Sequence, residues 1–424
     1  MFEVTLDSIE LSKALGYIEP AVENGMIYLE STKLGECILY SENKECAISI
    51  SLICSNSPIA GTTDYIDYKI FEKVVNSLSD KKSLTIRQED NSPLVTILYE
   101  HNVKPIELKT MSLPLLTKNP LAINPAPSDA ASFKASIFCG NIKLCTNIMS
   151  FDSKQSSVLD CCDIVTDGNN VNMSVVNVTK VIGCKRYMSP LSECNQEEFV
   201  MNLKPLKKLT SLFSSFKTLK LFQDANGICI CSDEKEYDFK TGEDKLENVS
   251  EVRVILHKFA SNYPTSSFDK ITRSNDMSVV ETTEISNSLN RILALTDDVY
   301  KDVLLTADNE NITMSIMSSH GKVEDKIPVK VGTNNPFQGK FDASTLKSIV
   351  GSNSASCMYI SPSTKSVNTF VIGCPDSQEP SVYFINSKAL KDSEKLDTTD
   401  ESDEEINEEN IQQVQDTTVQ EEDA

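Results

Sequence analysis

Residues suited to acid–base catalysis or metal binding are few and scattered in this sequence. The only histidines are His101, His257 and His320, which lie far apart and share no sequence context. No Ser/His/Asp ordering, glycine-rich phosphate loop or metal-spaced cluster is present, so no nucleophilic triad or nucleotide site is indicated. The sequence therefore predicts that the protein is not an enzyme and needs no cofactor or metal.

The thirteen cysteines do not resemble a ligand set either. Their number is odd, no Cys-x-x-Cys pair occurs, and several lie in apolar strand patterns such as Ile228–Cys231. Asp160 and Asp163 flank two of the cysteines, a pattern that fits a strand edge better than a pair of catalytic carboxylates. These features predict reduced, buried thiols in a cytosolic protein rather than a disulfide framework or a zinc site.

Basic residues offer the one feature that recurs along the chain. They occupy polar positions in six segments with helical spacing, as Lys69 and Lys73 do at i and i+4. These basic residues include Lys13, Lys73, Lys143, Lys204, Lys207, Lys208, Arg291 and Lys347. One cation on an exposed helix is ordinary surface, but a cation in a matching position on each of six helices, in a chain that is acidic overall, is less easily explained as ordinary surface.

Six strand–helix units position these residues, in three pairs along the chain. The first unit of each pair starts with an alternating strand at 2–6, 132–137 or 277–281, and a helix with regularly spaced apolar residues follows. In the first helix Leu11, Leu15, Ile18 and Val22 share one face. Three such copies imply three related domains.

Each copy contains a second unit of the same kind. Its strand covers 64–68, 198–202 or 338–342, and its helix has an apolar face, which in the first copy is Ile70, Val74, Val75 and Leu78. Short alternating segments joined by hairpin-like turns follow each helix. This order predicts an α+β fold of three repeated domains, each a doubled β-α-β unit with helices on one face of antiparallel sheets.

Proline-rich and polar stretches place the domain limits at 1–127, 128–272 and 273–390. The remainder, 391–424, is an acidic tail. From Asp392 to Ala424 it contains fourteen acidic residues and one basic residue. Because it has almost nothing apolar to bury, the sequence predicts that this tail is disordered.

The whole chain is strongly acidic, with 62 acidic and 40 basic residues and a net charge of −22. This balance argues against general attraction to nucleic acid or to an anionic membrane, although a basic stripe on one internal face is compatible with it. The first residues lack the basic and apolar regions of an export signal, and no stretch approaches the roughly 18 apolar residues of a membrane span. A cytoplasmic location without membrane contact is expected.

The layout resembles the bacterial-type DNA polymerase sliding clamp, the beta subunit. Phe2–Leu11 resembles the first strand and helix of that family, Leu108–Pro114 the close of its first domain, and Tyr263-Pro264 the aromatic-proline pair that closes its second. Ala307–Lys330 resembles its third-domain hairpin, so the likeness covers roughly residues 1–387. Asn177–Ile182 replaces the family's Thr-Asp-Gly-His-Arg-Leu run and the C-terminus is extended, which indicates a divergent clamp, with a virus as one candidate source.

The resemblance implies a DNA polymerase processivity factor that catalyses nothing. In the family pattern six domain equivalents form a ring around duplex DNA, so three domains per chain imply a head-to-tail homodimer with each chain as half of the ring. It also implies sequence-independent contact with double-stranded DNA, and a polymerase and a clamp loader that bind through short peptides. The candidate DNA-binding residues are the eight basic helix residues named above, from Lys13 to Lys347. The implied partner-peptide pocket consists of Leu159, Val178, Val181, Ile182, Pro264, Val382, Tyr383 and Phe384.

Other functions stay open from the residues alone. Each pocket residue would serve equally well in the core of a strand. A structural or virion protein built from repeated α+β domains is the main alternative, and it would need no aligned basic helices. Retention on circular but not on linear DNA distinguishes a clamp from such a protein.

Overall fold

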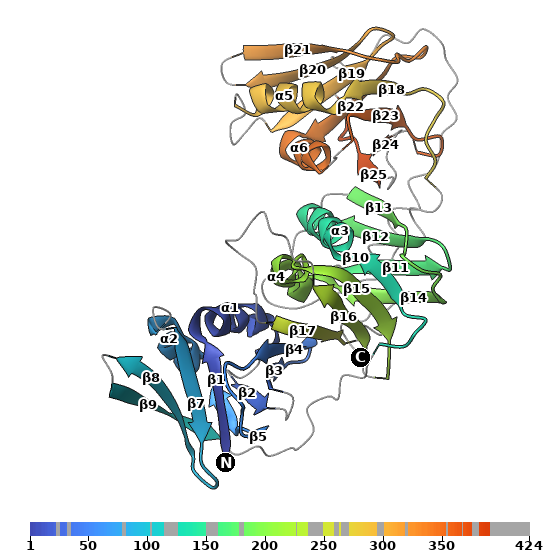
Figure 1. Ribbon diagram of the computed structural model, residues 1–424. Coiled ribbons are helices and arrows are strands. Elements are labelled where there is room, and N and C mark those ends of the chain that lie inside the picture. Colours follow the sequence, from blue (N-terminus) through green and yellow to red (C-terminus); the bar gives the residue numbers. More distant parts are fainter. Residues whose placement is uncertain are drawn as a thin grey trace, which may run out of the picture. The chain divides into compact units, whose positions relative to one another are not determined.

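A single order of elements recurs three times along the chain (Figure 1). In each repeat a strand leads into a helix, three strands follow, and the same strand, helix and three strands then occur again; the first repeat has one extra two-residue strand, Gly61–Thr62, between the two halves. The computed structural model describes residues 1–22, 26–31, 35–78, 82–101, 104–113, 126–149, 160–177, 182–225, 227–235, 249–257, 263, 271–294, 301–318, 321–352, 355–366, 368–374 and 381–390. The predicted acidic tail, 391–424, lies outside them.

The three repeats have the following elements. The first contains β1 (Phe2–Asp7), α1 (Ser8–Ile18), the 3₁₀ turn η1 (Glu19–Ala21), β2 (Met26–Ser31), β3 (Glu36–Glu42), β4 (Cys46–Ile53), β5 (Gly61–Thr62), β6 (Tyr65–Asp67), α2 (Tyr68–Ser77), β7 (Ser83–Gln88), β8 (Leu94–His101) and β9 (Lys104–Leu113). The second contains β10 (Ala131–Lys134), α3 (Ala135–Ile148), β11 (Cys161–Asp167), β12 (Val171–Asn177), β13 (Ile182–Met188), β14 (Gln196–Asn202), α4 (Leu203–Phe213), β15 (Phe216–Gln223), β16 (Ile228–Lys235) and β17 (Val249–Leu256). The third contains β18 (Ser278–Glu281), α5 (Thr282–Leu293), β19 (Asp302–Ala307), β20 (Asn311–Ser318), β21 (Gly321–Pro328), β22 (Phe337–Asp342), α6 (Ala343–Gly351), β23 (Cys357–Pro362), β24 (Thr369–Gly373) and β25 (Ser381–Asn386).

The change from strand to helix is encoded locally in most units. The last residue of the strand is also the N-cap of the helix, and in four units it is Asp or Asn, whose side-chain oxygen accepts hydrogen bonds from backbone N–H groups in the first helical turn. Asp7, for example, accepts from the amides of Ile9 and Glu10, both at 3.0 Å. The caps of α3 and α5, Lys134 and Glu281, make no such side-chain bond.

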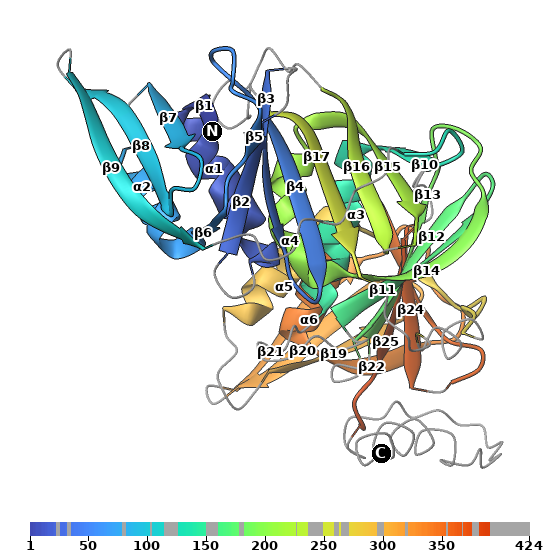
Figure 2. The ribbon, with the colours of Figure 1, turned by 90° about the horizontal axis from the view of Figure 1, so that it is seen from below.

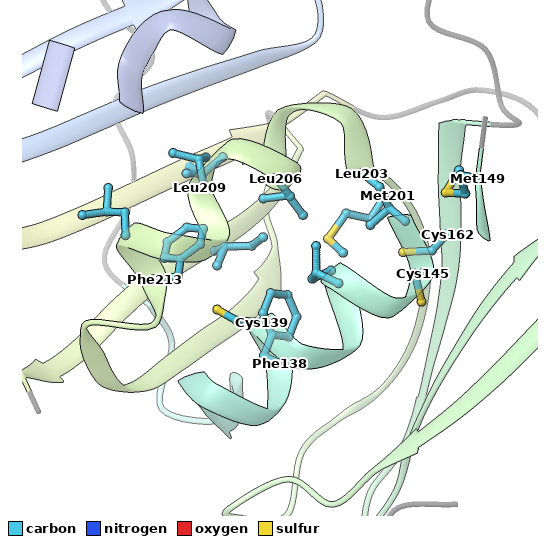
Figure 3. Close-up of a cluster of buried hydrophobic side chains, with 14 of the residues drawn as sticks. Phe138, Cys139, Cys145, Met149, Cys162, Met201, Leu203, Leu206, Leu209 and Phe213 are labelled. Atoms are coloured by element: carbon cyan, nitrogen blue, oxygen red, sulfur yellow. The ribbon is translucent and has the colours of Figure 1, made fainter. Parts of the chain in front are cut away.

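The buried face of each helix packs on the sheets and joins one large apolar core. Between α3 and α4 the core contains Phe138 and Cys139 from one helix and Leu206 and Phe213 from the other (Figure 3). All thirteen cysteines are free, and all except the half-buried Cys54 are buried, as the sequence predicted.

Most of the predicted inward faces are confirmed, including Leu11, Leu15 and Ile18 on α1. Ile70 is the exception, because its side chain is 51% exposed. α2 buries Tyr68, Phe71 and Val75, and Ile70, about 100° around the helix from Phe71, lies at the edge of this buried face. A smaller difference occurs at β10, which ends at Lys134 rather than continuing to residue 137.

Neighbouring strands run antiparallel throughout the described sheets. A 13-stranded sheet has the order β1-β7-β8-β9-β6-β2-β3-β4-β17-β16-β15-β10, with β5 beside β2. An 8-stranded sheet follows the order β14-β11-β12-β13-β25-β24-β23-β18, and a 4-stranded sheet the order β21-β20-β19-β22. The larger two sheets each continue from one repeat into the next.

Two strand pairs make these connections. β4 of the first repeat pairs with β17 of the second, and β13 of the second pairs with β25 of the third (Figure 1). We call them the first and the second junction. The predicted domain limits fall between the last strand of one repeat and the first strand of the next. Within the described residues, no helix has the length and apolar character needed to cross a membrane.

Candidate nucleic-acid interface and partner groove

The six α-helices form one continuous row. α1 packs on α2, α3 on α4 and α5 on α6 within the repeats, while α1 touches α4 and α3 touches α6 across them. The row therefore has the order α2-α1-α4-α3-α6-α5, and Figure 2 shows α4 beside α1 and α3. Because the helices bury one face against the sheets, their other faces form a common surface.

This helix row is basic. It carries three acidic residues, Glu10, Glu72 and Glu284. It carries nine basic residues, namely Lys13, Lys69, Lys73, Lys143, Lys204, Lys207, Lys208, Arg291 and Lys347. The difference is a net charge of +6 on the row, although the chain as a whole has −22.

All eight candidate DNA-binding residues lie on the helix row. Exposed side chains belong to Lys73, Lys143, Lys207, Lys208, Arg291 and Lys347, while Lys13 and Lys204 are half-buried. Because helices of neighbouring repeats touch, these cations lie on adjoining surfaces. The sequence alone does not show that helices so far apart along the chain are neighbours.

Lys208 is held by a carboxylate from another repeat. Its ammonium forms an ion pair with Glu19, the residue at which α1 ends and η1 begins. Beside this pair the Ser211 hydroxyl donates a 3.4 Å hydrogen bond to the Tyr17 hydroxyl, so α1 and α4 meet through polar groups at their solvent-facing edge. The sequence analysis missed Glu19, because its partner lies 189 positions away.

Arg291 is also paired. Its Nε and one terminal nitrogen donate to the same Asp325 oxygen at 2.9 and 2.6 Å, which ties the last turn of α5 to β21. Partial burial by itself would raise the pKa of the Asp325 carboxyl group. The Ser288 hydroxyl and the Arg291 guanidinium beside the carboxylate outweigh burial and bring this pKa below its ordinary value. Asp325 was the second residue that the sequence analysis missed.

Four members of the predicted partner pocket, Leu159, Val178, Val181 and Pro264, lie outside the described residues. The aromatic residue next to Pro264 is described. Tyr263 is buried, and its hydroxyl accepts a 2.9 Å hydrogen bond from the backbone N–H of Val176 on β12. This contact attaches the end of the second repeat to the strand that precedes 178–181.

The other four pocket residues lie at the second junction. Ile182 on β13 pairs with Ile385 on β25, next to Phe384. Val382 and Phe384 pack in a small apolar cluster with Tyr359 on the outer side of the third-repeat sheet. Tyr383 points to the opposite side and joins the main core together with Ile182, as the alternation of a strand requires. The junction therefore brings the four residues together but divides them between two faces of one sheet.

Among the residues that the structure describes, no group of three or more His, Cys, Asp or Glu residues is placed to hold a metal ion. Asp160 and Asp163 are both buried, on either side of the consecutive residues Cys161 and Cys162. Burial raises the pKa of Cys139 and of Cys145 to about 12, so these thiols stay protonated and unreactive near neutral pH.

The fold matches that of bacterial sliding clamps of known structure. The Pseudomonas aeruginosa DNA polymerase sliding clamp superposes with a TM-score of 0.73 at 12% identity. The Thermotoga maritima DNA polymerase III beta subunit gives 0.71 at 11% identity, and the beta subunit of the Streptococcus pyogenes DNA polymerase gives 0.70 at 14%. In each case 92% of this chain and 100% of the other chain are covered. No family model matches the sequence, and no curated protein matches it.

The chain therefore has the sliding-clamp fold, as the sequence resemblance indicated. The likeness lies in the order and arrangement of elements, since identity is only 11–14%.

Proposed function

We propose that this chain is a DNA polymerase processivity factor, a clamp that encircles duplex DNA and catalyses no reaction. The observation that carries the proposal is the helix row, with net charge +6 on a chain of net charge −22. Phosphates attract such a surface, while the acidic remainder repels DNA. Lysine and arginine contacts to phosphate carry no sequence information, which suits a protein that slides.

We propose that ring closure uses two strand edges that the junctions leave unused. β21 is one of the two outer strands of its sheet, the other being β22. β9 pairs with β8 along its length but with β6 only at Ser112 and Leu113, so Lys104 to Met111 faces no other described strand. In the order of elements, β21 is the third-repeat counterpart of β4 and β13. β9 is the first-repeat counterpart of β17 and β25. We propose that β21 of one copy pairs with β9 of a second, head to tail, in a homodimer.

The repeats also give the register of this pairing. Counting from the helix caps across the paired strands of each repeat makes three strand positions equivalent: Ile50 on β4, Arg186 on β13 and Asp325 on β21. The same counting makes three others equivalent: Ile106 on β9, Val252 on β17 and Ser381 on β25. Both junctions obey the rule, because Ile50 pairs with Val252 and Arg186 with Ser381. Asp325 of one copy should therefore lie opposite Ile106 of the other, and Glu324 opposite Glu107.

Cysteine crosslinking tests the closed homodimer. The pair Glu107→Cys and Glu324→Cys in one chain should give a covalent dimer on mild oxidation, with no larger species, because a closed ring of two has no free end. Lys104→Cys with Glu324→Cys, three positions out of register, is the matched control and should not crosslink. A ladder of trimers and longer chains would mean an open filament, and absence of any crosslink would refute the proposed edge pairing.

Charge reversal tests the DNA contact. Lys73, Lys143, Lys204 and Lys347 changed to Glu should weaken duplex binding and make its dependence on salt shallower by about 0.9 in logarithmic slope for each lost phosphate contact. The control changes four exposed lysines outside the helices, Lys44, Lys82, Lys217 and Lys365, to Glu. Equal losses in the two folded variants would show that total charge, and not the helix row, governs binding.

The remaining assignments follow from the same proposal. We place the domain limits at 1–127, 128–272 and 273–390, and the site of polymerase and clamp-loader peptides at the second junction, around Ile182, Val382 and Phe384. A clamp of this kind works where DNA is replicated, in the cytoplasm of a cell without a nucleus.

Changing Val382 and Phe384 to Ala should remove polymerase stimulation while crosslinking and DNA binding persist.

A further inference from the structure

We infer that Glu19 is an internal competitor for DNA phosphate, which occupies Lys208 and keeps the contact between α4 and the duplex weak. This inference rests on the proposed DNA-encircling function and names a residue that regulates it. Glu19 belongs to the first repeat and Lys208 to the second, so the pair spans the place where α1 and η1 meet α4. α4 carries three of the basic residues of the helix row, more than any other helix.

The position of Glu19 is unfavourable for the helix that it ends. It is the C-cap of α1, and no basic residue occupies the last turn. The carbonyl groups at a helix C-terminus carry partial negative charge, so a carboxylate there is repelled and a lysine or arginine is normally favoured. Glu19 is also the first residue of η1, where a negative charge is favoured, so the two helix ends have opposite effects on its carboxylate. The Lys208 ammonium is the charged group with which this carboxylate pairs.

The ion pair is suited to exchange. The side chains of Lys208 and Glu19 are 54% and 51% exposed. Surface pairs of this kind contribute little to folding, because water screens the charges and two long side chains must be ordered. A phosphate that approaches α4 can therefore take over the ammonium without unfolding anything, but it must first displace the carboxylate. The result is a contact that forms and breaks easily, as sliding requires.

Glu19→Gln tests this role, and Glu284→Gln is its matched control. Glu284 is an exposed acid on α5 that forms no ion pair within the described residues. Each change removes one negative charge, at the end of α1 in one case and on α5 in the other. Only Glu19→Gln should release Lys208, so it should raise affinity for a short labelled duplex at low salt by roughly two- to five-fold over the control. The salt dependence should also become steeper, by up to about 0.9 in logarithmic slope.

A double-mutant cycle separates release of Lys208 from other effects. In a Lys208→Ala background, Glu19→Gln should bring no more gain than Glu284→Gln, because the cation that it frees is gone. A gain that persists without Lys208, or equal gains for the two glutamine variants, would overturn the inference. Failure of the proposed function would look different, since neither the wild-type chain nor any variant would then bind duplex in a salt-dependent way.

Discussion

The two junctions join successive repeats at equivalent strand positions but with different chemistry. At the first junction β4 and β17 form seven residue pairs, and Ile50 faces Val252 in a fully apolar layer. At the second, β13 and β25 form five pairs, and Arg186 takes the place of Ile50. The helix residue beside this site also differs between the two repeats. The seventh residue after the helix cap is Ala14 on α1 but Asn141 on α3.

Arg186 and Asn141 form a buried polar contact that the first junction lacks. Arg186 is only 8% exposed, and its Nε donates a 2.8 Å hydrogen bond to the Asn141 side-chain oxygen. The Tyr383 ring from β25 reaches the same place. Burial and the neighbouring Cys184 raise the pKa of its hydroxyl, and the guanidinium of Arg186 offsets this only in part. The third repeat thus contacts a buried cation of the second.

Equivalent pairings of backbone strands thus enclose two kinds of buried layer, an apolar one at the first junction and a partly polar one at the second. An apolar layer is favoured by the hydrophobic effect and needs only complementary volume. A buried guanidinium gives up its hydration, so it restricts which side chains can stand opposite it. The second junction, where we place the partner site, therefore has the more specific but not the more stable contact.

The largest expected effect is at Tyr383. Tyr383→Ala removes a ring that is 1% exposed and leaves a cavity between β25 and the second repeat, so the free energy of unfolding should fall by about 3–5 kcal/mol. Chemical denaturation measures the loss. Tyr383→Phe keeps the ring and should cost about 1 kcal/mol or less. If both variants lose the same amount, the hydroxyl and not the ring holds the junction.

Ile50→Ala is the corresponding change at the first junction. Ile50 is fully buried, and its truncation should lower the free energy of unfolding by about 2–5 kcal/mol, against about 0.5–1.5 kcal/mol for Ile50→Val. Denaturation followed by a probe in each repeat would show where unfolding begins. A loss below 1 kcal/mol for Ile50→Ala would mean that the apolar layer adds little to this junction.

Exchanging the chemistry of the junctions should have an intermediate effect. Arg186→Ile alone leaves the Asn141 amide buried without its partner and should cost about 1–3 kcal/mol. Adding Asn141→Ala recreates the residues of the first repeat and should restore stability to the wild-type value or above it, because the desolvated charge is gone. Thermal unfolding of the single and double variants checks this. A double variant that is less stable than Arg186→Ile would contradict the equivalence of the two junctions.

The smallest effect concerns Asp325, the equivalent position in the third repeat. Its pKa is lower in the folded chain than the ordinary value near 3.9, so its charged form stabilises the fold above about pH 4. That contribution is lost as the pH falls through the lowered folded pKa. Asp325→Asn should therefore lower the melting temperature slightly at pH 7, by an amount equivalent to less than about 1 kcal/mol of stability, and this difference from the wild type should shrink as the pH is lowered below 4. A difference that stays the same at every pH would rule out the carboxylate charge as the cause.

The repeats could be predicted from the sequence because their signals are local. Alternating strands, apolar helix faces and caps such as Asp7 lie within about a dozen residues of one another. Ile70 shows the limit of this reasoning, since the apolar residues of α2 cover a wider arc than the face that the helix buries around Phe71 and Val75. An apolar pattern alone does not fix which edge of such an arc is exposed.

The contacts between repeats could not be predicted in this way. β4 pairs with β17 and Glu19 with Lys208 across about 190 to 210 residues, and no local pattern specifies which edges or charges meet over that length. The pocket illustrates the same limit. Val382, Tyr383 and Phe384 are neighbours in sequence, but strand alternation places Tyr383 in the main core and the other two in a separate cluster.

The most direct test of the central claim is topological. The Glu107→Cys and Glu324→Cys chain is incubated with a nicked circular plasmid, oxidised to seal the ring, and then washed in high salt with detergent. If the protein encircles DNA, the covalent dimer should stay with the circular plasmid through the wash and be released when the plasmid is cut once. Equal retention on circular and linear DNA, or complete loss from both, would contradict encirclement.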